Sequence, residues 1–272
     1  MRDFKDIAYI RDNDKGHMLD IYLPDAAEIG TAQSTTQIPL IIYVHGGAWR
    51  ADDKSTVAYI GPGLLEATDG RVAVALVNYR LSTRNPDSVR HPDHLNDVRA
   101  AVEFLITNQE YPGSELIDKN NVFLVGHSAG AHLAMMTVLD NCEQQKKWLG
   151  SIKGVFGIGG IYDIPALLEQ YPSYSDFVGM AFSQEQYAAA SPLTIASRGC
   201  SNKISEHMRF MVVNSTKDEL IDPRQSVLFV QQLVQAGYGN VNMTVCDLGD
   251  HYGELERKEF WQMVCHFVFS SY

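Results

Sequence analysis

The chain has 272 residues, of which 45% are hydrophobic and 20% charged, so it can bury a large core. Its formal net charge of −11 argues against nucleic acid or an anionic membrane surface as a partner. The 4 cysteines are widely separated and form no C-x-x-C pair, so neither a zinc site nor a disulfide framework is indicated. The first residues lack the apolar core of a signal peptide, and no apolar run is long enough to span a membrane. These features predict a cytoplasmic protein.

Runs with strand character recur along the whole chain. Residues 6–10 and 17–24 resemble an antiparallel edge hairpin, and a polar connector follows at 25–37. Later runs are almost purely apolar and lie at 38–47, 71–80, 120–128, 152–160, 208–216 and 240–249. Uninterrupted apolar strands are typical of a parallel sheet that is covered on both faces.

Helical patterns separate these strands. Residues 91–109 carry an apolar stripe at three- and four-residue spacing, made by Leu95, Val98, Val102 and Leu105. Residues 222–238 start with Asp222 as a candidate helix cap and Pro223 as the first helical residue. Residues 254–269 form a terminal helix. Strands that alternate with helices in this way predict a doubly wound α/β domain.

The predicted architecture is one three-layer α/β domain over residues 1–272. Its sheet is mostly parallel, with about eight strands and helices on both faces. The segment 162–205 is longer than one crossover helix requires. We interpret it as short helices that form a cap-like, lid-like insertion over the strand ends, with plain surface packing as the alternative.

A serine lies between two glycines at the end of one apolar strand. The pentapeptide Gly126-His127-Ser128-Ala129-Gly130 joins that strand directly to a helix. This context is typical of the nucleophile elbow of α/β hydrolases, in which the turn is so tight that side chains two residues from the serine would collide. The elbow lifts the hydroxyl above the carboxyl ends of the strands, where open sheets bind ligands. The N–H of Ala129, at the start of the helix, is a candidate oxyanion donor.

A second glycine-containing motif ends an earlier strand. It reads His45-Gly46-Gly47-Ala48-Trp49. An oxyanion hole needs a further N–H from this loop, and glycines let the backbone approach the substrate. Gly46 and Gly47 are therefore candidate oxyanion residues. His45 is interpreted as a structural hydrogen bonder, because the general base of this fold follows the nucleophile in the chain.

The remaining catalytic residues should follow later strands in the order acid, then histidine. Asp218 comes shortly after one strand, with Glu219 and Asp222 as nearby rivals. His251 lies between the last strand and the terminal helix. His266 lies within that helix among apolar neighbours and is interpreted as a packing residue.

The predicted chemistry is acyl transfer to a serine. Ser128 attacks a carbonyl carbon, His251 moves the proton, and Asp218 holds the imidazole in the required tautomer. This chemistry needs no metal and no organic cofactor. The expected partner is a small-molecule substrate.

These motifs resemble the hormone-sensitive-lipase-like branch of the α/β hydrolases, which carries a fourth glycine where this chain has Ala48. The H-G-G-A-W form is similar instead to kynurenine formamidases (arylformamidases) of the fungal type. The segments GIYDIPALLEQYPSY, KDELIDPRQS and DLGDHYGEL also resemble that family, over residues 38–256 or so. The resemblance implies hydrolysis of N-formyl-L-kynurenine to L-kynurenine and formate, a step of tryptophan catabolism, by Ser128, Asp218 and His251.

The implied substrate also suggests binding residues. Its aromatic ring would pack against aromatic walls, for which the candidates are Trp49, Tyr162, Tyr171 and Tyr174. Packing in the core or the lid is an equal alternative for each of them. Its carboxylate would pair with a cation such as Arg80 or Arg84, although a solvated surface arginine is the favoured interpretation of both.

Two other functions stay open from the sequence alone. A carboxylesterase of small acyl or aryl esters would use the same three residues, because fold and triad do not fix the substrate. A non-catalytic receptor of this fold would bind a ligand in a former active site, but such a protein would be expected to lack one of the three residues. The sequence does not decide between a monomer and a homodimer.

Overall fold

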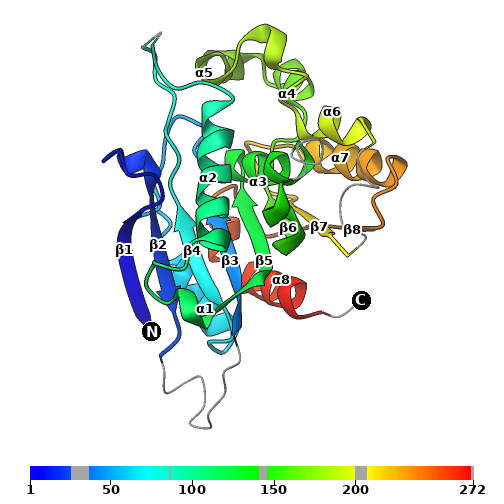
Figure 1. Ribbon diagram of the computed structural model, residues 1–272. Coiled ribbons are helices and arrows are strands. Elements are labelled where there is room, and N and C mark those ends of the chain that lie inside the picture. The colour runs from blue at the N-terminus through cyan, green and yellow to red at the C-terminus, as the bar shows by residue number, and fades with distance from the viewer. Residues whose placement is uncertain (26–36, 86, 141–145, 200–206, 271–272) are drawn as a thin grey trace.

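The computed structural model describes residues 1–25, 37–85, 87–140, 146–199 and 207–270. Its centre is an 8-stranded sheet in the order β1-β2-β4-β3-β5-β6-β7-β8 (Figure 1). The strands are β1 (Arg2–Ala8), β2 (Met18–Leu23), β3 (Ile38–Val44), β4 (Ala73–Val77), β5 (Ile117–His127), β6 (Ile152–Ile158), β7 (Arg209–Ser215) and β8 (Asn240–Cys246). β2 pairs antiparallel with β1 and β4, and the other neighbours are parallel. The predicted α/β architecture is confirmed.

Helices cover both faces of this sheet. They are α1 (Ile60–Ala67), α2 (Asp93–Thr107), α3 (Ala129–Leu139), α4 (Ile164–Gln170), α5 (Ser175–Ala181), α6 (Pro192–Ser197), α7 (Arg224–Gln235) and α8 (Lys258–Phe269). Alternate residues of β3 enter different cores, because successive side chains of a strand point to opposite faces. Ile42 belongs to the core on the side of α2, α3 and α7, whereas Ile41 belongs to the core on the side of α1 and α8. The result is the three-layer arrangement expected from apolar strands.

Several elements differ from the sequence-based expectation. β1 starts at Arg2 rather than residue 6, because a bulge between Phe4 and Ile7 interrupts the alternation that marks a strand. α1 was not predicted, since its first turn contains Gly61 and Gly63, and glycine is a poor helix former. α7 starts at Arg224, and its N–H donates to the Asp222 carboxylate at 2.7 Å.

The helices α4, α5 and α6 follow one another between β6 and β7. Figure 1 shows α4 and α5 beyond the carboxyl ends of the central strands. This placement agrees with the expected cap-like insertion. The role of the insertion as a cap and the assignment of residues 1–272 to a single domain both stay predictions. Parts of the expectations lie outside the described residues, namely most of the connector at 25–37, residues 200–205 of the insertion, Cys142 and Cys200. In the described part of the chain, every helix is too short or too polar to span a lipid bilayer.

Candidate active site

Ser128 occupies a strained turn between β5 and α3. Its backbone has φ 55° and ψ −121°, a conformation that L residues with a side chain rarely adopt. A Cβ on Gly126 would lie 2.4 Å from the carbonyl oxygen of Gly130. A Cβ on Gly130 would lie 2.1 Å from the carbonyl oxygen of Val44. Only glycine fits either position, so the motif has a steric cause and the turn is a nucleophile elbow.

His251 and Asp218 form the hydrogen-bonded pair that the sequence anticipated. The Nδ1 of His251, after β8, lies 2.8 Å from Oδ2 of Asp218, after β7. Both side chains are buried. The other carboxylate oxygen of Asp218 accepts the N–H groups of Leu220 and Ile221, each at 2.9 Å. These contacts fix the carboxylate so that it can hold the imidazole in one orientation.

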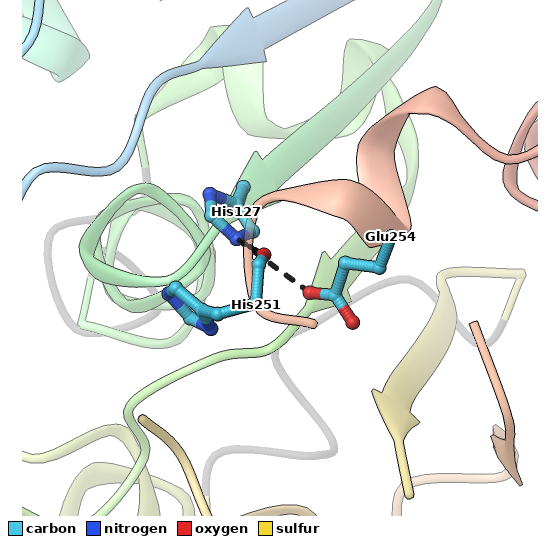
Figure 2. A group of neighbouring side chains, drawn as sticks. All are labelled: His127, His251 and Glu254. Carbon is cyan, nitrogen blue, oxygen red and sulfur yellow. Dashed lines mark hydrogen bonds and ion pairs between the residues drawn. The ribbon is translucent and has the colours of Figure 1, made fainter. Parts of the chain in front are cut away.

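His127 ties the base to the nucleophile strand. Its Nε2 lies 2.9 Å from the carbonyl oxygen of His251, and the two rings are 4.5 Å apart between centroids (Figure 2). A carbonyl only accepts hydrogen bonds, so Nε2 of His127 carries the proton. Burial lowers the pKa of His127 well below its ordinary value, with the nearby His251 as a smaller cause, and keeps the ring neutral. The structure thus places His251 directly beside the residue that precedes Ser128.

Glu219 makes a second hydrogen bond to the backbone of His251. Its Oε2 accepts the backbone N–H of His251 at 3.1 Å. Asp222 bonds the N–H of Arg224 instead. Of the three acidic residues considered from the sequence, only Asp218 contacts the imidazole, and the rivals have other partners.

The glycine loop after β3 lies against the serine. A Cβ on Gly46 would lie 3.2 Å from Cβ of Ser128, which places its backbone at the nucleophile. Gly47, Ala48 and Trp49 all have positive φ, at 87°, 51° and 59°, so the loop is bent tightly. Strain of this kind often accompanies functional backbone. The N–H of Ala129, in the first turn of α3, has no partner within the helix by the geometry of helix ends.

His45 supports this loop from the core, in agreement with its interpretation as a structural residue. Its ring stacks on Tyr79 with centroids 4.5 Å apart. The Tyr79 hydroxyl contacts the carbonyl oxygens of His45 at 3.1 Å and Gly46 at 2.7 Å. Burial lowers the pKa of His45, so a neutral ring suits this position.

Glu254 is a buried acid that no pattern in the sequence singles out. Its side chain is fully buried, and among the described residues neither carboxyl oxygen makes a hydrogen bond of good geometry. One oxygen lies 3.5 Å from Nε2 of His127 (Figure 2). Burial first, and the charge of Asp218 second, raise the pKa of Glu254 to about 9, although the nearby Ser215 N–H slightly lowers it. Glu254 is therefore protonated at neutral pH, next to the candidate triad.

His127, His251 and Glu254 offer donor atoms within 4.8 Å of one another, a spacing that could suit a metal ion. The existing contacts argue against this use. His127 Nε2 carries a hydrogen toward a carbonyl, and His251 Nδ1 is bonded to Asp218. The protonated Glu254 would also have to ionise in a buried position. The expectation of a metal-free site is retained on these grounds.

Two of the residues expected to wall the substrate pocket are core residues instead. Trp49 is 0% exposed, and its indole N–H donates to Nδ1 of His132 at 3.3 Å. Tyr162 is also 0% exposed and stacks on Phe229 at 4.4 Å between centroids. Neither ring presents surface to a ligand. Their aromatic character reflects packing, the alternative that the sequence left open.

Tyr171 and Tyr174 are partly exposed and remain candidates. Their rings stack with centroids 4.9 Å apart. The Tyr174 hydroxyl donates to the carbonyl oxygen of Leu220 at 3.2 Å. Since the N–H of Leu220 bonds Asp218, this pair lies next to the turn that carries the candidate acid.

The two candidate arginines are both paired within the protein. Arg80 makes hydrogen bonds to both carboxylate oxygens of buried Asp97, at 2.8 and 2.7 Å. Arg84 pairs with Asp176 at 2.7 Å and is 74% exposed. Arg84 is therefore a solvated surface arginine, as the sequence suggested, whereas Arg80 forms a structural ion pair with Asp97.

A strained serine elbow, a bonded histidine–aspartate pair and a glycine loop, all at the carboxyl edge of one sheet, define a serine hydrolase of the α/β-hydrolase fold. Sequence comparison agrees with this class, since the profile of the BD-FAE family matches residues 19–233. The chain belongs to the BD-FAE family of α/β hydrolases. 

Named relatives and solved structures both support this assignment. A kynurenine formamidase of Meyerozyma guilliermondii is 38% identical over 71% of this chain and 70% of its own length. One of Danio rerio is 34% identical over 89% of this chain and 73% of its own. A truncated carbohydrate esterase from gut microbiota superposes with a TM-score of 0.75 at 19% identity, over 98% of this chain and 95% of its own. Esterase B of Lactobacillus rhamnosis superposes with a TM-score of 0.75 at 18% identity, over 98% of this chain and 84% of its own. These two structures support the fold.

Proposed function

We propose that this hydrolase cleaves the formyl amide of N-formyl-L-kynurenine, releasing L-kynurenine and formate. The observation that carries the proposal is the His251–Asp218 pair, which lies beside the Ser128 elbow in a chain whose relatives include kynurenine formamidases. A formyl carbonyl is unhindered, and an aniline leaves more easily than an alkylamine. A serine triad therefore suffices for this reaction.

In the proposed first half-reaction, Ser128 Oγ attacks the formyl carbon while His251 takes the hydroxyl proton. The N–H groups of Gly46, Gly47 and Ala129 are the candidate donors to the resulting oxyanion, and loss of one such donor typically costs about 3–4 kcal/mol of barrier. The C–N bond then breaks, and the imidazolium of His251 protonates the departing aniline nitrogen. Formyl remains on Ser128 as an ester.

In the second half-reaction, His251 takes a proton from water, and the resulting hydroxide equivalent attacks the formyl ester. The ester bond breaks, the proton returns to Ser128 Oγ, and formate leaves. Throughout, Asp218 keeps a hydrogen on Nδ1 of His251, so that Nε2 is free to exchange protons. The contacts of His127 and Glu219 to the His251 backbone would position the base. No step calls for a metal or an organic cofactor.

A second candidate is a carboxylesterase. The two solved structures of similar fold are both esterases. A probable isoprenylcysteine alpha-carbonyl methylesterase of Oryza sativa is 27% identical over 80% of this chain and 51% of its own length. Ester and arylamide cleavage use the same catalytic parts, so only substrate preference separates the two candidates.

The test compares kcat/KM for N-formyl-L-kynurenine with kcat/KM for p-nitrophenyl esters of graded acyl length. The formamidase proposal expects the formamide to be the preferred substrate. Brisk turnover of esters together with poor turnover of the formamide would overturn it in favour of the esterase. A fluorophosphonate probe should label the wild type and not Ser128→Ala, whereas a receptor without catalysis would not be labelled.

The cellular setting is a further part of the proposal. A cytoplasmic location and a small-molecule substrate are the expectations from the sequence, as is the lack of nucleic-acid and membrane partners. Sedimentation of the purified chain at several concentrations would decide between a monomer and a homodimer.

A further inference from the structure

Arg50 lies at the rim of the candidate site. It directly follows the H-G-G-A-W loop, and its backbone N–H donates to the carbonyl oxygen of Gly47 at 3.0 Å. Its side chain is exposed, unlike that of Trp49 before it. Arg80, Arg84 and Arg99 each pair with a carboxylate, but no such pair is formed by Arg50 with the described residues. The backbone of Arg50 is thus fixed four positions after Gly46, and its exposed guanidinium can pair with a negatively charged ligand.

The side chain of Arg50 reaches the insertion. Its guanidinium carbon lies 5.2 Å from the ring centroid of Phe177 in α5, within the range of a cation–π contact. Its charge also acts on Tyr252, the residue after His251, whose ring lies 5.3 Å from that of His251. Burial raises the pKa of Tyr252, and the positive charge of Arg50 partly opposes that rise. Arg50 therefore contacts α5, and its charge reaches the residue that follows the candidate base.

Aromatic rings continue from Phe177 toward the candidate acid. The ring of Phe177 lies 4.9 Å from that of Tyr174, which in turn stacks on Tyr171 at 4.9 Å. Tyr174 is tied to the Asp218 turn through the carbonyl oxygen of Leu220. These three rings, Tyr171, Tyr174 and Phe177, form an aromatic strip that leads from Arg50 to the turn of Asp218.

Charges of both signs surround Tyr252 at this rim. Asp52 and Glu219 raise its pKa, whereas Arg50 lowers it. The chain as a whole carries a net charge of −11, which disfavours free carboxylates as ligands unless a cation receives them. A ligand with a carboxylate, an ammonium group and an aromatic ring matches this combination of Arg50, acidic side chains and aromatic strip.

We propose that Arg50 binds the α-carboxylate of an aromatic amino-acid substrate, whose ring lies along the strip of Tyr171, Tyr174 and Phe177. This inference rests on the proposed function and names the residue that selects N-formyl-L-kynurenine over neutral formamides. Arginine suits the role because its planar fork makes two parallel hydrogen bonds to a carboxylate. Arg50 does not touch the reacting bond in this arrangement, so it governs binding rather than proton transfer.

The first test measures Arg50→Gln with N-formyl-L-kynurenine and with formanilide, which has the same reacting bond but no amino-acid group. Loss of a charge-assisted contact should raise KM for the amino-acid substrate by about 10- to 100-fold, with kcat nearly unchanged. The constants for formanilide should not change, and Arg50→Lys should recover part of the loss. The matched control is Arg84→Gln, which removes a paired arginine beside the same helix and should leave both substrates unaffected. Equal losses for both substrates in Arg50→Gln, or no loss for either, would overturn the proposal.

A second measurement separates this inference from the proposed function. L-kynurenine keeps the carboxylate and the ring, so it should inhibit hydrolysis of p-nitrophenyl acetate competitively. Its inhibition constant should rise by about 10- to 100-fold in Arg50→Gln. That rise would support the Arg50 subsite even if the wild type failed to hydrolyse N-formyl-L-kynurenine. Such a failure would contradict only the formamidase proposal. An inhibition constant equal in both proteins would refute the role of Arg50.

Discussion

The sheet edge that carries Ser128, Asp218 and His251 differs in kind from the insertion of α4, α5 and α6. At the sheet edge, backbone packing determines the residue types, since a Cβ on Gly126 or Gly130 would overlap a carbonyl group. In the insertion, a Cβ on Gly179 would meet no atom within 4 Å, and the rings of Tyr171, Tyr174 and Phe177 are only partly buried. From this comparison we expect the reaction to depend on rigid backbone geometry, and substrate recognition to depend on side chains of short helices.

Ser128→Ala should give the largest effect. We expect kcat to fall by at least about 10⁴-fold, because the nucleophile acts as a unit with its base and cannot be replaced by binding alone. Chemical denaturation should show little loss of stability, since alanine keeps the Cβ that the turn already accommodates. Residual activity within about tenfold of the wild type would show that another residue attacks the substrate.

A pair of glycine substitutions tests the contrast directly. Gly130→Ala should destabilise the fold by about 4 kcal/mol or more, because its Cβ would lie 2.1 Å from the Val44 carbonyl oxygen. Gly179→Ala in α5 should be neutral or stabilising by about 0.5–1 kcal/mol, because alanine is the better helix former. Urea denaturation of both variants measures the difference. Similar effects at the two sites would remove the distinction between the regions.

Glu254→Gln tests the buried acid beside the sheet edge. Glu254 has a pKa of about 9 in the folded protein, against an ordinary value of 4.5. Between pH 4.5 and pH 9 the carboxyl is therefore protonated in the folded state and ionised in the unfolded state. Wild-type stability should therefore fall as pH rises through that window, whereas the glutamine does not titrate. At pH 8 the variant should be the more stable protein by on the order of 4 kcal/mol, and near pH 4.5 the gap should close. 

Denaturation curves at several pH values measure this gap. A gap that does not change with pH would show that Glu254 is already ionised in the fold. A loss of activity above pH 9 in the wild type, absent from Glu254→Gln, would link the same proton to the candidate triad.

The smallest effect is expected in the insertion. Tyr171→Ala removes a stacked ring, and such pairs contribute about 0.5–1.5 kcal/mol, so KM for N-formyl-L-kynurenine should rise by no more than about tenfold. The kcat for phenyl acetate should be unchanged, since no catalytic contact is lost. A larger fall in kcat than in affinity would show that Tyr171 contributes to the chemical step, and the insertion would then no longer differ from the sheet edge in its role.

The sequence was informative where a local backbone constraint selects a residue type. The elbow glycines, the order of Ser128, Asp218 and His251, and the apolar parallel strands all leave such local signatures. It was uninformative where a role depends on packing between distant segments. Trp49 and Tyr162 resemble pocket walls in the sequence, yet both lie in the core. Nothing beside residue 254 in the chain indicates that folding removes its carboxyl from water.

His127 and Arg50 illustrate the same limit. The residue before the serine is free to vary in the elbow motif, so His127 gave no signal until its bond to the His251 carbonyl was visible. Arg50 leaves no signal in the sequence either, because a single arginine after a tryptophan is ordinary. A search for polar residues directly adjoining the two catalytic motifs would have found both.

The hydrogen bond from His127 to the carbonyl of His251 also has a mechanical consequence. It fastens the segment after the eighth strand to the end of the fifth, one residue ahead of the attacking hydroxyl. Any movement of the His251 backbone would have to break this tether or carry the elbow along, whereas the imidazole itself is held by Asp218. The backbones of His251 and Ser128 should thus move as one body.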